Sequence, residues 1–257
     1  MNRGFIAGIL LACAFARPLG AQQRAGWLQA DGFYHSVTND FGDWKGVGLR
    51  AVVPSGQANI WYGELVAQEA FHDRGIWASA GNRHFFGPYT FTFASLGGGT
   101  GDYYLPDLRA DFSVGHSWLE KRNLVTILGA TYVNSKDIYE DFALLGSVAA
   151  YFPGVTAEAG LRINWSWPDA VQTARAFGAV TLGHERRRLV VLRAGAGQEG
   201  YQLTGDVETQ RKFSSFEASI GWREWLKGHT GVLAGLEVYD NPFYTRTGVT
   251  LGVFRHW

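Results

Sequence analysis

The C-terminal stretch constrains the fold of this chain more than any other part of its sequence. Between Arg246 and Trp257, apolar residues recur at every second position, at Val249, Leu251 and Val253. In water, a strand that ends a protein on an aromatic residue leaves an edge open to other chains. In a lipid bilayer the same strand can close a barrel, which satisfies every backbone polar group and places the aromatic side chain at the interface. A closing strand of a soluble β-sandwich is the alternative.

The same stretch resembles the C-terminal signal that the bacterial outer-membrane assembly machinery recognises. That signal has a polar residue, a glycine two positions later and an aromatic residue at the end, here Thr250, Gly252 and Trp257. Arg255 stands where the pattern usually has an apolar residue. We therefore predict that the assembly machinery is a partner of this strand.

Alternation with period two recurs along the chain and is clearest from Val155 to Trp165. Polar and apolar residues alternate there one by one, so one face of the strand meets a polar medium and the other an apolar one. Segments 109–118, 213–222 and 232–238 repeat the scheme. We predict that the charged residues opposite the apolar faces line a barrel lumen and are candidates for conducting a solute: Arg109, Asp111, Glu158, Arg162, Arg175, Arg193, Glu217, Arg223 and Glu237.

Composition favours a membrane barrel over a soluble sandwich. The chain has 34 glycines and 15% aromatic residues. The part after residue 21 has no run of about 20 apolar residues, the length that a transmembrane helix needs. The apolar faces consist mainly of small residues, which lipid accepts but which would fill a sandwich core poorly. Aromatic residues near the segment ends predict two interfacial girdles, made of Trp44, Trp118, Tyr151, Trp165, Trp222 and Trp257.

Connection lengths indicate how the strands are joined. Counting back from the C-terminus, long connections alternate with short ones, as expected when long loops lie outside the cell and short turns in the periplasm. The long ones are 239–245, 199–212, 167–173, 134–141 and 97–106, and the short ones 226–229, 184–187, 152–154 and 119–123. Segments between 27 and 87 are poorly patterned. We predict an all-β, transmembrane, antiparallel up-and-down β-barrel of about 12 strands, with 14 as the alternative.

The N-terminus has the features of a cleaved signal peptide over residues 1–21. Arg3 supplies the positive charge, residues 5–15 are mostly apolar, and residues 19–21 form a plausible cleavage site. Residues 10–13 resemble a lipoprotein signal, but the apolar run continues past Cys13. Because Cys13 is the chain's one cysteine, the barrel domain predicted over residues 22–257 has no disulfide.

The sequence lacks the residue patterns that would support catalysis or metal binding. None of the histidines, at positions 35, 72, 84, 116, 184, 229 and 256, has a serine two residues later, the spacing that places both on one face of a strand. No His-x-His pair or acidic triplet is present, so we predict no metal site and no cofactor, and we interpret the histidines as solvated turn or interface residues. Segment 97–101 lacks the Lys-Ser/Thr of a phosphate loop. Lys and Arg equal Asp and Glu at 23 each, which gives no reason to expect a nucleic-acid partner.

Several short segments are similar to the YaiO family of outer-membrane β-barrel proteins: 105–111, 124–132, 150–154, 221–225, 237–244 and 247–254. The resemblance extends over about residues 44–257. It implies a surface-exposed barrel in the bacterial outer membrane, with no established catalytic residues. Similar barrels close exporters of exopolysaccharide, which makes an exopolysaccharide a candidate partner. Those exporters carry a large helical-repeat domain that this chain is not expected to contain.

These observations predict a non-enzymatic outer-membrane protein in contact with membrane lipids and lipopolysaccharide. A narrow channel, or an accessory barrel for a glycan or small polar solute, is the function that the polar inner face favours. Two alternatives stay open: an enzyme that modifies lipid or lipopolysaccharide, and a structural or adhesive barrel with a plugged lumen. The inward charges fit either a conducting lining or ion pairs that fill and stiffen the barrel.

Overall fold

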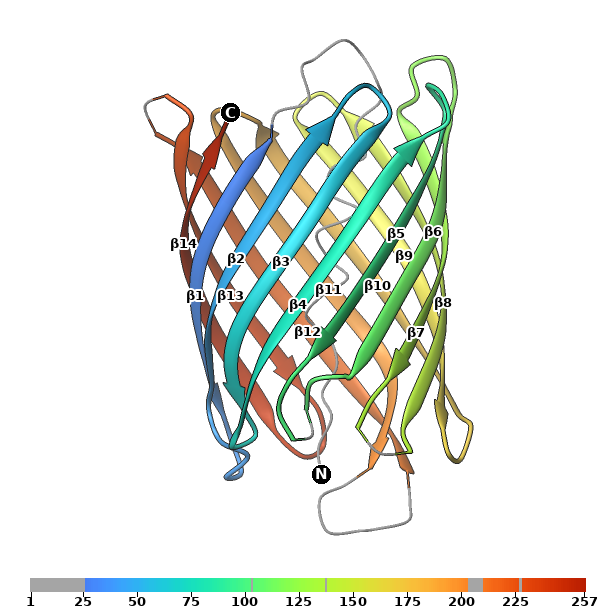
Figure 1. Ribbon diagram of the computed structural model, residues 1–257, viewed down its shortest axis with the longest axis vertical. Helices are drawn as coiled ribbons and strands as arrows, with labels where there is room; N and C mark the ends of the chain where they lie inside the picture. Colours follow the sequence, from blue (N-terminus) through green and yellow to red (C-terminus); the bar gives the residue numbers. More distant parts are fainter. Residues whose placement is uncertain (1–25, 103, 137, 203–209, 227) are drawn as a thin grey trace.

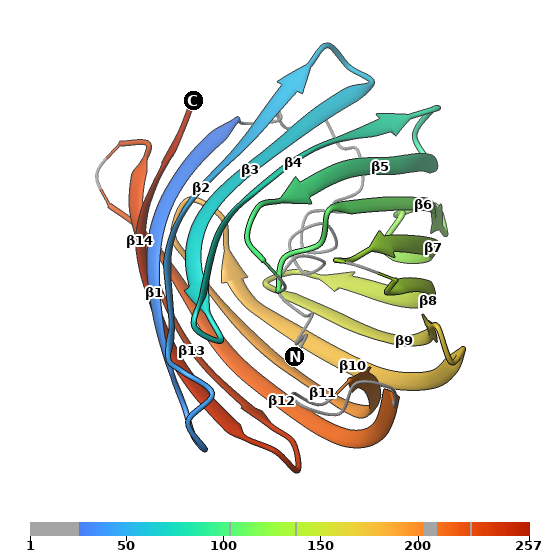
Figure 2. The ribbon, with the colours of Figure 1, turned by 60° about the horizontal axis from the view of Figure 1, so that its bottom comes forward.

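The computed structural model describes residues 26–102, 104–136, 138–202, 210–226 and 228–257. They form one closed barrel of antiparallel strands, each paired with its neighbours in sequence order (Figures 1 and 2). The predicted up-and-down β-barrel is therefore confirmed, and its strands number 14 rather than 12. The predicted signal peptide and positions 203–209 of the predicted loop 199–212 lie outside the described residues.

In chain order the strands are β1 (Trp27–Val37), β2 (Trp44–Ser55), β3 (Asn59–Ala70), β4 (Asp73–Phe85), β5 (Thr90–Gly99), β6 (Leu108–Trp118), β7 (Leu124–Asn134), β8 (Glu140–Phe152), β9 (Val155–Trp167), β10 (Val171–His184), β11 (Arg188–Gln202), β12 (Gln210–Trp225), β13 (Thr230–Asp240) and β14 (Thr245–His256).

Tight connections explain the two additional strands. Residues 153–154 join β8 to β9, and Gly154 adopts a φ of 73°, which glycine takes without a steric penalty. Several predicted loops are partly strand, because β11 continues to Gln202 and β12 begins at Gln210. Strand lengths run from 10 residues in β5 to 16 in β12. With so little of the chain in loops, fourteen strands fit.

The seam between the first and last strands closes the barrel as predicted. β14 pairs with β1 over its length, from Trp27 opposite His256 to Val37 opposite Arg246. Gly252 lies in this seam, and a Cβ atom there would lie 2.6 Å from the carbonyl oxygen of Ala30. The close approach of the two strands thus gives the glycine of the C-terminal pattern a role in the folded barrel.

The outer wall is apolar. Val47, Leu128 and Leu251 expose 63%, 72% and 62% of their surface, and many other large apolar side chains are exposed as well. A soluble protein rarely exposes so large an apolar area, whereas lipid covers it. The part of the chain that the structure describes contains no helix long and apolar enough to cross a membrane.

The barrel has two ends, which we name by the chain. At the terminal rim, β1 begins and β14 ends, near the upper edge of Figure 1. At the far rim lie the connections 38–43 and 100–107. Of the six aromatic residues predicted for the girdles, Trp118 and Trp257 are exposed, by 48% and 58%. Trp44 and Tyr151 instead pack inside the barrel, because each lies on the inward face of its strand.

Candidate functional site

Two different surfaces face each other across the lumen. Strands β1 to β5 form the aromatic wall, whose inward side chains include Phe33, Trp44, Tyr62, Trp77 and Phe93. Strands β6 to β12 form the ionic wall, which carries eight of the nine lumen residues predicted from the sequence. Glu237, the ninth, lies on β13.

On the ionic wall, Arg109 and Asp111 make a two-pronged ion pair. Arg109 donates from Nε and Nη2 to the two carboxylate oxygens of Asp111, each at 3.0 Å. The Thr131 hydroxyl donates to the same carboxylate at 2.8 Å, and the Ser95 hydroxyl at 3.1 Å. Arg109 is only 7% exposed. The pair is therefore held in a single geometry by neighbours on the two adjacent strands, β5 and β7.

Arg175 is the centre of a second network. Its guanidinium lies 2.8 Å from Glu199 and 3.5 Å from Glu217. Glu199 also accepts hydrogen bonds from the hydroxyls of Ser215 and Tyr239. Glu199 was missed by the sequence analysis because it falls in a segment interpreted as a loop, although it continues the inward alternation of β11.

Arg162 lies directly across from Arg175 on the neighbouring strand. Two adjacent arginines would repel each other, but Asp111 and Asp141 also act electrostatically on Arg162. The carboxylate of Asp141 in turn accepts hydrogen bonds from Asn164 and Ser166. The repulsion is thus offset within the ionic wall.

Two of the remaining predicted lumen residues, Arg193 and Arg223, lie against aromatic rings. Arg193 lies 5.9 Å from the ring centre of Phe177, and Arg223 lies 5.2 Å from that of Trp27. In the strand register, Glu158 and Arg193 flank Ala179 from opposite sides. The five positively charged residues among the nine predicted lumen residues are all arginines. The forked guanidinium of arginine suits such pairs.

A cavity of about 450 Å³ lies inside the barrel against the aromatic wall. Of the nine predicted lumen residues, Arg109, Asp111 and Glu237 line it. The charged residues that line it are balanced, four arginines and four carboxylates: Arg50, Arg83, Arg109, Arg246, Asp31, Glu64, Asp111 and Glu237. Five of these eight were missed by the sequence analysis, and Arg50 shows how they are held: its guanidinium bridges Asp31 at 2.5 Å and Glu64 at 2.7 Å.

His35 contradicts the interpretation of all histidines as solvated turn or interface residues. It is 8% exposed and faces the cavity from β1. Its imidazole fills space left by Gly248 on β14, where a Cβ would lie 2.0 Å from the ring. Nδ1 of His35 lies 3.6 Å from Glu237, whose carboxylate pairs with Arg246 at 3.0 Å.

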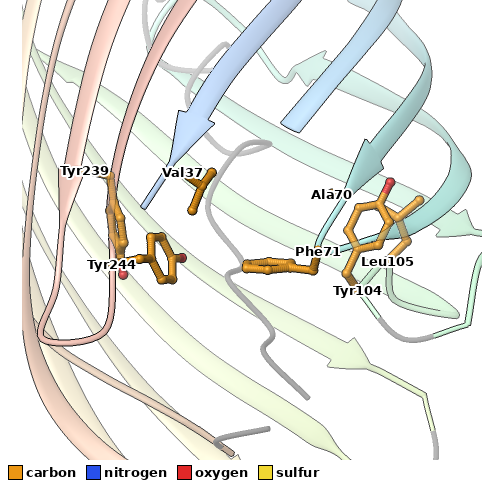
Figure 3. Close-up of a cluster of buried hydrophobic side chains, with 7 residues drawn as sticks. All are labelled: Val37, Ala70, Phe71, Tyr104, Leu105, Tyr239 and Tyr244. Atoms are coloured by element: carbon orange, nitrogen blue, oxygen red, sulfur yellow. The ribbon is translucent and has the colours of Figure 1, made fainter. Parts of the chain in front are cut away.

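An apolar cluster lies on the far-rim side of the cavity (Figure 3). This mouth cluster consists of Val37, Ala70, Phe71, Tyr104, Leu105, Tyr239 and Tyr244. Phe71 meets Tyr244 edge to face, with ring centres 6.0 Å apart. Ala70, Tyr104 and Leu105 also line the cavity, so the cluster borders it on this side. The Tyr104 hydroxyl donates to the backbone carbonyl of Gln68 at 2.9 Å, which fixes the 100–107 connection to β3.

Tyr244 lies in the connection between β13 and β14. Burial in the mouth cluster raises the pKa of its phenol to about 12. Its backbone N–H donates to the side-chain oxygen of Asn241 at 2.9 Å, in a turn of the kind that asparagine favours. The ring is therefore held over the lumen by its own loop.

Of the residues predicted as an assembly signal, Thr250 and Gly252 share the inward face of β14, and Trp257 follows its last residue. Thr250 lines the cavity, Gly252 lies in the closing seam, and Trp257 is 58% exposed at the terminal rim. Recognition of these residues by the assembly machinery stays a prediction. The described ranges contain no group of three or more His, Cys, Asp or Glu residues that could hold a metal ion.

A closed barrel with an apolar outer wall and a charged interior defines a bacterial outer-membrane β-barrel protein. Within that class, residues 28–202 match the YaiO membrane beta barrel domain, and the chain belongs to this family. The resemblance seen in the sequence is thereby confirmed, as is the localisation to the outer membrane. No match to a curated protein was found.

Solved structures share the fold at low sequence identity. The CymD monoaromatic hydrocarbon channel aligns with a TM-score of 0.62 at 6% identity, over 92% of this chain and 89% of that one. The outer-membrane protein Omp33 of Acinetobacter baumannii aligns with 0.55 at 10%, over 91% and 100%. The translocator domain of the autotransporter NalP from Neisseria meningitidis aligns with 0.51 at 15%, over 93% and 91%. At such identities the likeness shows the fold alone.

Proposed function

We propose that this protein is a narrow, non-enzymatic channel for a small polar solute such as a short glycan. The observation that carries the proposal is the cavity of about 450 Å³ inside the barrel, which combines aromatic side chains with paired charges. Its volume is within the range of small-molecule sites, about 300–1,000 Å³. The fold likeness to CymD, described as a monoaromatic hydrocarbon channel, is consistent with passage of a small molecule.

The lining also sets the expected selectivity. Four arginines and four carboxylates balance, so neither cations nor anions gain a strong preference from net charge. The mouth cluster makes the path narrow at the far rim. We therefore expect a low conductance with weak ion selectivity, and a steep dependence of permeation on solute size.

The test is reconstitution of the purified protein in planar bilayers and in liposomes. A small, reproducible conductance and uptake of monosaccharides in preference to larger oligosaccharides are expected. Absence of both, even after the mouth cluster is trimmed by Phe71→Ala and Tyr244→Ala, would refute the channel and favour the plugged structural barrel. Mass spectrometry of lipid A and phospholipids with and without the protein tests the enzymatic alternative, and we expect no change.

A further inference from the structure

Three residues that carry hydrogen-bond donors line the part of the cavity next to the mouth cluster. His35 comes from β1, Trp44 from β2 and Arg246 from β14, and all three line the cavity. Trp44 also packs against the mouth cluster. We call this group, with Glu237 from β13, the donor quartet.

Four nitrogen atoms of the quartet are buried without a hydrogen-bond partner within the described protein. The indole Nε1 of Trp44, both ring nitrogens of His35 and Nε of Arg246 are buried and have no hydrogen-bond partner there. Leaving such groups unpaired is costly, so an acceptor that reaches them from the cavity would bind favourably.

Their positions are fixed by contacts that do not use these atoms. The guanidinium of Arg246 lies 4.1 Å from the ring centre of Trp44, and another of its nitrogens pairs with Glu237 at 3.0 Å. His35 lies between Phe33 and Trp44, with ring centres 5.1 Å and 6.3 Å away. The quartet is thus pre-organised, which lowers the entropy cost of binding.

Charge excludes most ionic ligands. Glu237 neutralises Arg246, and the whole cavity lining carries as many carboxylates as arginines. An anion or a cation would lose its hydration without gaining a net opposite charge. Aromatic side chains such as Phe33, Tyr62 and Trp77 complete the lining and favour a ring-shaped, partly apolar body.

We propose that the donor quartet and the adjoining aromatic wall bind a neutral ring compound that carries several acceptor oxygens, the chemistry that a sugar shares with a hydroxylated aromatic ester. The inference deepens the proposed channel function and rests on the same cavity, in which the quartet is the selectivity site. The indole N–H, the imidazole and the guanidinium Nε–H donate to the oxygens of the ligand, while the aromatic rings contact its apolar face.

Binding is measured by calorimetry on the full chain in detergent, with N-acetylglucosamine and methyl 4-hydroxybenzoate as the neutral probes. Benzoate and agmatine are the charged comparators. At least one neutral probe is expected to bind more tightly than both comparators, and which one does so distinguishes a sugar from an aromatic ligand. Failure of both neutral probes to bind, or tighter binding of a comparator, would overturn the proposal.

Trp44→Phe retains an aromatic ring and removes one donor, which should weaken binding about fivefold. The matched control is Trp225→Phe. Trp225 also has a buried indole N–H without a hydrogen-bond partner among the described residues, but it packs against Phe254 and His256 and does not line the cavity. Its substitution should leave binding unchanged. Equal effects of the two substitutions would count against the quartet.

His35→Phe keeps a ring in the space beside Gly248 and removes both nitrogens, so it provides a second, independent loss of binding. Folding of each variant is checked by its heat-dependent migration in gel electrophoresis.

The channel proposal and the donor-quartet proposal can fail separately. Conductance without probe binding would refute the quartet alone, whereas probe binding without conductance or uptake would refute the channel.

Discussion

The aromatic wall and the ionic wall belong to one barrel but are stabilised by different forces. On the ionic wall, Arg109 pairs with Asp111 on its own strand, and Arg175 pairs with Glu199 and Glu217 on the next two strands. On the aromatic wall, rings occupy space that glycines leave on the next strand, as Trp77 does beside Gly97. The first mechanism needs opposite charges at matched heights, and the second needs a small residue opposite a large one. The cavity lies where such ring packing accompanies ion pairs, such as those of Arg50 with Asp31 and Glu64.

The largest effect, a rise in conductance, is expected from changes to the mouth cluster at the far-rim end of the aromatic wall. Removing the rings of Phe71 and Tyr244 together takes away the edge-to-face contact that spans the mouth. Truncation of a packed aromatic residue to alanine costs about 3 kcal/mol at the lower end of its range. We expect the double variant to remain folded in detergent and to conduct several times more current in planar bilayers.

Phe86→Ala is the matched control for the mouth variant. Phe86 lies in the turn between β4 and β5 at the terminal rim and is 68% exposed, so its removal opens nothing. An unchanged conductance of the mouth variant, or an equal rise in the control, would show that the mouth cluster does not limit the path.

The second-largest effect, a loss of thermal stability, is expected on the ionic wall. Arg175→Met leaves Glu199 and Glu217 without their shared cation in a site where the arginine side chain is 13% exposed. Removing one partner of a buried ion pair costs about 3–5 kcal/mol. The transition to the heat-denatured, slower-migrating form should shift to a clearly lower temperature, as measured by gel electrophoresis of heated samples.

Arg188→Met tests the same pairing in an exposed setting. Arg188 pairs with Glu224 at 2.5 Å, but its side chain is 64% exposed, so water and salt screen the attraction. Its transition should hardly move. If both variants behaved alike, burial within the barrel would not be what makes the ionic wall important.

A third effect tests the ring-beside-glycine packing of the aromatic wall. At Gly248 a Cβ atom would lie 2.0 Å from the His35 ring, so Gly248→Ala forces the imidazole out of its site. Such overpacking typically costs about 1–3 kcal/mol. Gly63→Ala is the control, since a Cβ there meets nothing within 4 Å. Thermal denaturation of the two variants should separate them, and equal transitions would contradict the packing mechanism.

The difference between the walls also decides what the sequence could predict. The alternation of polar and apolar residues is clear in the sequences of β6, β9 and β12. In these strands Arg109, Glu158 or Glu217 stands opposite apolar lipid-facing residues. In β1 to β5 the inward residues are themselves often aromatic, as at Phe33, and so the polar-to-apolar contrast between the two faces is weak. The poorly patterned region of the sequence is therefore the region that builds the cavity.

The residues of the donor quartet could be predicted only in part. Glu237 was identified because apolar residues flank it in β13, whereas Trp44 was assigned to an interfacial girdle. Period two does place His35 on the same face as Gln29 and Asp31, a signal that could have identified it as inward. What no local pattern contains is that β1, β2, β13 and β14 bring these four side chains together, because that depends on closure of the barrel.

The smallest effect concerns the 38–43 connection, which joins two strands of the aromatic wall at the far rim. The carboxylate of Asp43 accepts hydrogen bonds from the Tyr34 hydroxyl and from the backbone N–H of Val37, the latter at 3.1 Å. These bonds, the Tyr34 hydroxyl first, lower the pKa of Asp43. A carboxyl whose pKa is lower in the folded state stabilises it above the ordinary value of about 3.9. That contribution is lost as the pH falls through the lowered pKa.

Hydrogen exchange at the Val37 amide should detect this loss. Protection, corrected for the intrinsic exchange rate, is expected to decline below about pH 4 in the wild type. In Asp43→Asn it should be lower at neutral pH and nearly independent of pH, because an amide accepts the same bonds without titrating. The amide of Phe86, bonded to the carbonyl of Thr90 at 3.0 Å at the terminal rim, is the internal reference. A parallel decline at Phe86 would mean that acid loosens the whole barrel rather than the carboxylate-anchored connection.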